Sequence, residues 1–114
     1  MEIRIFNKKL ILSNNRLILS NNRLQSLPAE IGNLINLQYL SLSSNKLQSL
    51  PVEIGNLINL QELLLYCNQL QTLPTEIGNL INLKVLRLFY NKIGLFYIIV
   101  IAGLYIFHKI KKFN

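Results

Sequence analysis

The chain has 114 residues, of which 51% are hydrophobic, and it carries a formal net charge of +7. This length allows one domain at most. The sequence contains no Asp, and its single cysteine, Cys67, lies far from its single histidine, His108. A metal site or a Cys–His nucleophile needs more groups than these. We therefore expect no catalysis, no metal and no cofactor.

The positive charge belongs to the two ends of the chain. The net charge is +4 before Leu24, −1 between Leu24 and Asn91, and +4 from Lys92 onward. A nucleic-acid groove would place Lys and Arg on one face of the folded body, so we expect no nucleic-acid partner. Basic ends fit a membrane surface or an anionic partner better.

The first segment, residues 1–16, is predicted to form an N-terminal cap or hairpin. Residues 10–16 and 17–23 are the same seven amino acids in tandem, and only the second copy keeps the register of the sequence that follows. Asn14 and Asn15, which lie between two apolar runs, tolerate the positive φ of a tight turn. We expect residues 5–12 to pair antiparallel with residues 17–20; a frayed terminus is the alternative.

A unit of 23 residues then organises the chain. Residues 57–79 repeat residues 34–56 with 16 of 23 positions identical, and residues 17–33 and 80–93 are partial copies. A fixed period of this length predicts a solenoid in which each coil stacks on its neighbours. The unit has a fixed set of apolar, Asn and Pro positions: Leu34, Leu37, Leu40, Leu42, Asn45, Leu47, Leu50, Pro51 and Ile54.

Two spacings within the unit predict its local structure. Leu40 and Leu42 alternate with polar residues, which indicates a strand with one buried face. From Leu47 onward the apolar residues are about three apart, which suits a 3₁₀ segment, and Pro51 has no N–H for a strand ladder. One coil cannot enclose its own leucines, so about three coils are the minimum for a stable fold.

This unit resembles the leucine-rich repeat in its 23-residue Leu-Pro-x-x-Ile form, known from intracellular Ras-group-like proteins and bacterial relatives. The resemblance covers residues 17–93 and implies an α/β fold class. It implies a short solenoid of about four coils, with parallel strands on the concave face and loops or 3₁₀ turns on the convex side. The recurring Gly32, Gly55 and Gly78 are interpreted as turn residues, and Glu30, Glu53 and Glu76, which are in the same register, as solvated side chains.

Four asparagines recur where each strand ends, at Asn22, Asn45, Asn68 and Asn91. The backbone groups of a strand lose their ladder partners at such a corner. An inward Asn side chain has both donors and an acceptor to satisfy them. We therefore predict that these four residues form a structural ladder.

The differences between the two full copies indicate a binding surface. Five of the seven differences fall at outward strand positions and the corner, while the inward leucines do not change. We predict that a protein partner, and no small-molecule substrate, binds this concave strand face. The predicted contact residues are Tyr39, Ser41, Glu62, Leu64, Tyr66, Val85, Arg87 and Phe89.

The C-terminal segment, residues 94–114, departs from the repeat. Residues 95–107 carry no charged side chain, and four basic residues close the segment. We predict an apolar helix over residues 93–110, a candidate transmembrane anchor close to the 20 or so residues that a span needs. The alternative is a cap over the last coil.

Location and function follow as expectations. One cysteine cannot form a disulfide within the chain, the sequence has no Asn-x-Ser/Thr site, and its start has no apolar signal region. These features favour a cytoplasmic place for the repeats, with possible anchoring through the C-terminal segment. The predicted function is a non-catalytic protein-interaction module. The alternative is a truncated remnant of a longer repeat protein, with a C-terminal cap and no independent function.

Overall fold

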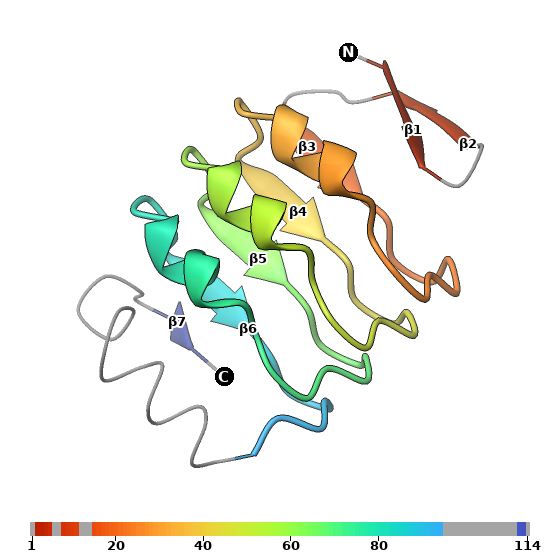
Figure 1. Cartoon of the computed structure of the whole chain (residues 1–114), viewed down its shortest axis with the longest axis vertical. Coiled ribbons are helices and arrows are strands. Elements are labelled where there is room, and N and C mark those ends of the chain that lie inside the picture. Colours follow the sequence, from red (N-terminus) through yellow and green to blue (C-terminus); the bar gives the residue numbers. More distant parts are fainter. Residues whose placement is uncertain (1, 6–7, 12–14, 95–111, 114) are drawn as a thin grey trace.

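The structure, a computed structural model, describes residues 2–5, 8–11, 15–94 and 112–113. Its body is a stack of coils in which a layer of 3₁₀ helices faces a parallel sheet (Figure 1). The helices are η1 (Ala29–Asn33), η2 (Val52–Asn56) and η3 (Thr75–Asn79). The sheet contains β3 (Arg16–Ile18), β4 (Tyr39–Ser41), β5 (Glu62–Leu64) and β6 (Val85–Arg87), in that order. The predicted short solenoid of parallel strands and 3₁₀ turns is confirmed.

The buried leucines lie one above another because the strands pair without a shift in the repeat. Leu40 pairs with Leu17 on one side and with Leu63 on the other, and Leu63 pairs with Leu86. The Leu40 and Leu63 side chains have no exposed surface. The predicted inward positions thus form one continuous core through the stack. Burial of each leucine stabilises the fold by about 1.5–3 kcal/mol relative to exposure.

Proline begins each 3₁₀ helix. Pro28, Pro51 and Pro74 precede η1, η2 and η3 with φ of −71°, −68° and −64°. The ring fixes this φ, and the proline carbonyl accepts the first helical hydrogen bond, as from the N–H of Ile54 at 3.1 Å. The chain therefore turns back toward the sheet at the same point of every coil.

The recurring glycines lie in the 3₁₀ turns on the return side of the coils, and Gly32 and Gly55 are in addition packing residues. No glycine among the described residues has a positive φ. A Cβ on Gly32 would lie 2.8 Å from the Glu53 carbonyl oxygen, and one on Gly55 would lie 2.6 Å from that of Glu76. Glycine is needed here because adjacent coils approach too closely for a side chain.

Each strand ends at a corner where one residue adopts the left-handed backbone conformation. Asn21, Ser44, Cys67 and Tyr90 occupy the same place in successive coils and have φ of 57–60°. In the two inner coils the asparagine that follows points inward. Asn45 and Asn68 are 7% and 8% exposed, so their amide groups need partners inside the protein.

Each inner asparagine completes the coil that precedes it. The Asn68 Oδ1 accepts a hydrogen bond from the Leu47 N–H at 3.0 Å, and its Nδ2 donates to the Leu42 carbonyl at 2.9 Å. Asn45 makes the equivalent bonds to Leu24 and Leu19, and Asn91 makes them to Leu70 and Leu65. Asn22 belongs to the first coil, and its side chain donates to the carbonyl of Ser20, in its own coil, at 3.3 Å.

The two ends of the stack differ from the repeats. At the N-terminal end, β1 (Glu2–Ile5) pairs antiparallel with β2 (Lys8–Ile11) in a separate two-stranded sheet (Figure 1). The expected pairing of residues 5–12 with residues 17–20 is therefore wrong, since among the described strands β1 and β2 pair with each other and β3 pairs with β4. Only two residues separate β1 from β2, a connection length that favours a local hairpin.

At the C-terminal end, β7 (Lys112–Phe113) adds a fifth parallel strand beside β6, with Val85 opposite Lys112 and Leu86 opposite Phe113. The predicted apolar helix of residues 93–110 falls almost wholly on residues 95–111, which lie outside the described residues. Within the described ranges, no helix is long and apolar enough to span a bilayer.

The ladder predicts a difference between its inner and outer members. Asn68→Ala removes the partners of the buried Leu47 N–H and Leu42 carbonyl, so we expect a loss of about 3 kcal/mol in unfolding free energy. That loss corresponds to a fall in Tm of roughly 10 °C. Asn22→Ala is the matched control, because Asn22 is exposed, and its effect should stay within about 0.5 kcal/mol. Equal effects in thermal unfolding followed by circular dichroism would contradict the ladder's role.

Candidate partner-binding face

The side of the sheet opposite the leucine core is called here the strand face. Its side chains form rows across the strands because parallel neighbours pair residue by residue. One row contains Arg16, Tyr39, Glu62 and Val85, and the next contains Ile18, Ser41, Leu64 and Arg87. A third row lies two residues further along each coil and contains Ser20, Ser43, Tyr66 and Phe89.

Most of the predicted contact residues lie at the surface of this face. Phe89 is 40% exposed. The other half-buried members of the predicted set are Tyr39, Glu62, Leu64, Tyr66, Val85 and Arg87. The structure brings them together on neighbouring strands, and their role in binding stays a prediction. Ile18, on the edge strand β3, is the most exposed apolar residue of the strands at 61%.

Ser41 does not belong to the accessible part of the face. Only 3% of its surface is exposed, so the expectation that it contacts a partner is not compatible with its burial. Its hydroxyl lies 2.8 Å from that of Ser20 and 3.2 Å from that of Ser43, and Ser43 is also buried, at 2%. The three hydroxyls satisfy one another, and a side chain this short does not reach past its larger neighbours Tyr39 and Leu64.

One end of the strand face is aromatic. The rings of Tyr66 and Phe89 stack with centroids 4.9 Å apart and planes within 1° of parallel. Tyr90 meets Phe89 edge to face at 5.2 Å and is 75% exposed. Such ring pairs contribute about 0.5–1.5 kcal/mol beyond area burial. These three rings form a preorganised apolar surface at the corner.

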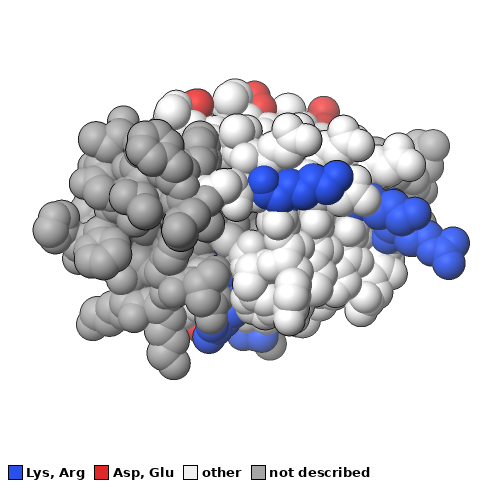
Figure 2. Space-filling view, turned by 90° about the horizontal axis from the view of Figure 1, so that it is seen from below, with Lys and Arg blue, Asp and Glu red and all other residues white. Residues whose placement is uncertain are grey.

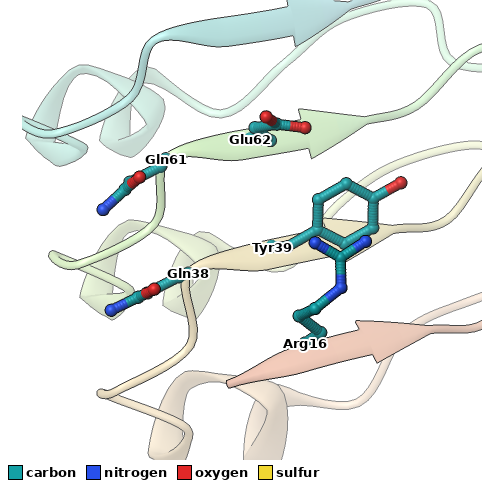
Figure 3. Close-up of a pocket in the computed structure, with 5 residues that line it drawn as sticks. All are labelled: Arg16, Gln38, Tyr39, Gln61 and Glu62. Carbon is teal, nitrogen blue, oxygen red and sulfur yellow. The ribbon is translucent and has the colours of Figure 1, made fainter. Parts of the chain in front are cut away.

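The start of the strands is polar instead. The Arg16 guanidinium carbon lies 3.9 Å from the Tyr39 ring centroid, a cation–π contact. Beside this pair is an open hollow of about 120 Å³, which Glu62 and two glutamines also line (Figure 3). The glutamines are Gln38 and Gln61, each one residue before its strand. The hollow offers hydrogen-bond donors and acceptors to a polar group.

Charge is unevenly distributed around the coils. Glu30, Glu53 and Glu76 each lie in the first turn of a 3₁₀ helix. Figure 2 shows acidic side chains along its upper edge, apart from most of the Lys and Arg side chains. On the strand face itself, Glu62 is the one acidic member of the two strand rows named above, and the same rows contain two basic residues, Arg16 and Arg87.

Sequence reasoning missed two surface features. The first is the polar hollow at Gln38 and Gln61. In the sequence, the only sign of this hollow is that the two glutamines occupy the same position of the repeat. The second is a row of exposed isoleucines on the way back to the sheet, at Ile35, Ile58 and Ile81, which are 50–59% exposed. The Asn59 and Asn82 side chains bind the backbone of this row, donating to the carbonyls of Ile35 and Ile58 at 2.8 and 2.7 Å.

Residues suited to catalysis or metal binding do not gather in the described part of the chain. No group of three or more His, Cys, Asp and Glu side chains could hold a metal ion there. Cys67 is a free, half-buried thiol at the corner, and His108 lies outside the described residues. The described surface therefore offers contact area and hydrogen-bonding groups.

Comparisons with known proteins agree with this architecture. Residues 12–97 match the family model of a leucine-rich repeat region. A solved structure of a leucine-rich repeat protein from Leptospira interrogans is similar, with 47% sequence identity and a TM-score of 0.80. The match covers 85% of this chain and 24% of the Leptospira protein, so the chain spans about a quarter of that protein's length. No curated protein matches.

The burial of Ser41 predicts a large effect for a charge at this position. Ser41→Asp places a carboxylate where 3% of the side chain reaches water. We expect a loss of more than about 2 kcal/mol in unfolding free energy. Ile18→Asp is the matched control in the same row, 61% exposed, and should change stability by less than about 0.5 kcal/mol. Similar chemical-denaturation midpoints for the two variants would refute the burial of Ser41.

Proposed function

The chain belongs to the leucine-rich repeat family, and we propose that it is a non-catalytic module that binds a protein partner on its strand face. Proteins of this family generally act through binding, and the whole Leptospira protein is about four times longer than the stretch matched here. The proposal therefore concerns the repeats alone.

The observation that carries the proposal is the aromatic end of the face. Phe89 and Tyr90 are 40% and 75% exposed although the coils bury every leucine of the core. Exposed apolar surface with a polar surround is typical of interaction sites. Tyr and Arg are also favoured as anchors at interfaces, and Arg87 lies in the adjoining row.

The pattern of variation between coils supports the same surface. Residues 34–56 and 57–79 keep every inward leucine, and the outward positions of the strands change type. For example, Tyr39 pairs with Glu62, and Ser41 pairs with Leu64. A surface that each coil fills differently can present one composite site to a partner.

The C-terminal segment has two proposed roles, an anchor in a membrane and a cap on the array. The pairing of β7 with β6 favours the cap, because that strand covers the sheet edge that the last coil leaves open. We propose the cap as its role. A cytoplasmic place of action for the repeats is likewise a proposal, supported by the lone Cys67.

Deletion of residues 95–114 separates the two roles of the segment. A cap predicts that the shortened chain loses several degrees in Tm and that the intact chain needs no detergent for extraction. An anchor predicts that the shortened chain keeps its Tm. It also predicts that the intact chain is released from membranes by detergent and not by salt. Sedimentation of lysates and thermal unfolding measure both outcomes.

The binding role is tested with a pair of matched double variants. Tyr66→Ala with Phe89→Ala removes the stacked rings and should reduce partner capture by immobilised protein at least about tenfold, the effect of roughly 1.4 kcal/mol. Ile58→Ala with Ile81→Ala removes two apolar side chains that are 50% and 59% exposed in the row of isoleucines, away from the strand face, and should leave capture unchanged.

The isoleucine variant should unfold within about 4 °C of the parent, the shift that roughly 1 kcal/mol produces. The aromatic variant should stay folded with a lower Tm, because it also loses the stacked ring pair. If only the isoleucine variant lost capture, the binding site would lie on the row of isoleucines, which would contradict binding on the strand face. Absence of any specifically captured protein would favour the remnant without independent function.

A further inference from the structure

The corners of three of the four coils carry an exposed cation at the end of the strands where the aromatic rings lie. The residue after each ladder asparagine is Arg23, Lys46, Gln69 or Lys92, and the three basic side chains are exposed. They are called here the basic ridge. The backbone N–H of Lys46, Gln69 and Lys92 donates to Leu24, Leu47 and Leu70 at 2.8, 2.9 and 2.8 Å. These three side chains therefore leave the coil at equivalent points.

No acidic residue adjoins the ridge along the coils. The residues that follow each ridge position are Leu, Gln and Ser or Thr in each full coil. Glu30, Glu53 and Glu76 belong to the 3₁₀ helices, and Glu62 lies at the first residue of β5, at the other end of the strands. The positive potential at the corner is thus left for a ligand to neutralise.

The basic ridge adjoins the three aromatic rings at the corner, Tyr66, Phe89 and Tyr90. Tyr90 is two residues before Lys92, and its ring contacts Phe89, which stacks on Tyr66. Neighbouring parallel strands are about 4.8 Å apart, so Lys46 and Lys92, two coils apart, are separated by roughly 10 Å. About three residues of an extended polypeptide span that distance.

We propose that the strand face binds an acidic polypeptide segment that carries an aromatic or aliphatic side chain. Its carboxylates pair with the basic ridge, and its apolar side chain packs on Tyr66, Phe89 and Tyr90. This inference rests on the proposed function and adds the chemical class of the partner. Charge complementarity of this kind governs partner choice and association rate.

A nucleic acid fits the same surface less well. Sequence-independent binding of single strands needs aromatic faces on which bases stack. The Tyr66 and Phe89 rings already stack on each other at 4.9 Å, and the Tyr39 ring is covered by Arg16. Glu62 would also repel phosphates approaching the polar end of the face.

The proposal is tested first by selecting binders to the intact protein from a random peptide library displayed on phage. We expect enrichment of sequences that combine Asp or Glu with Tyr, Phe, Leu or Ile. Enrichment of neutral or basic sequences, or no enrichment, would overturn the proposal. If an oligodeoxythymidine probe binds the protein and acidic peptides do not, the surface would be assigned to nucleic acid instead.

Affinity measurements on an enriched peptide then place it on the ridge. Lys46→Gln and Lys92→Gln introduce the residue that Gln69 already provides at this register, and each should weaken binding roughly threefold, and both together about tenfold. The loss should shrink at high salt. The matched control is Lys84→Gln, since Lys84 is exposed and shares the register of Gln38 and Gln61 at the opposite end of the strands.

Equal weakening by Lys84→Gln would mean that net charge alone matters and would overturn the ridge. Unchanged affinity in the Lys46 and Lys92 double variant would do the same. If partner capture then still depended on Tyr66 and Phe89, the proposed function would stand without its acidic partner. If capture depended neither on the basic ridge nor on Tyr66 and Phe89, the proposed function and the acidic partner would both be refuted.

Discussion

The inward asparagine at the end of each strand is the contact on which the rest of the molecule depends. A coil must turn away from the sheet there, and its backbone groups lose their partners in a region closed to water. The Asn68 amide supplies both an acceptor for Leu47 and donors for the carbonyls of Leu42 and Leu65. Because one side chain joins two coils, it also fixes their register. The rows of the strand face exist only because that register is kept.

The core and the strands could be predicted from the sequence because both follow from one period. Leu40 and Leu63 occupy the same position of the unit, so stacking places them together without further information. The ends could not be predicted in this way. The tandem copy at residues 10–16 breaks the period, and the hairpin from Glu2 to Ile11 depends on local pairing. The close approach at Gly55 was missed for another reason, since it lies between coils and leaves no trace in the local pattern.

The candidate face was predictable in position and less so in detail. Alternation identified Tyr66 and Phe89 as outward residues, and the structure adds that their rings stack. Ser41 is outward by the same alternation and is nevertheless buried, because the exposed fraction of a short side chain is decided by its neighbours on adjacent coils. The polar hollow at Gln38 and Gln61 is likewise a property of several coils together. Periodicity fixes which side of the sheet a residue occupies, and tertiary packing decides whether a partner can reach it.

Each inner asparagine binds backbone groups of the coil before it, so the contacts between coils follow the order in which the chain is synthesised. Asn45 satisfies the Leu24 N–H and the Leu19 carbonyl, groups that precede it by 21 and 26 residues. On the ribosome, these groups emerge before the side chain that will bind them. The corner of each inner coil therefore gains its full set of hydrogen bonds only once the corner of the following coil has been translated.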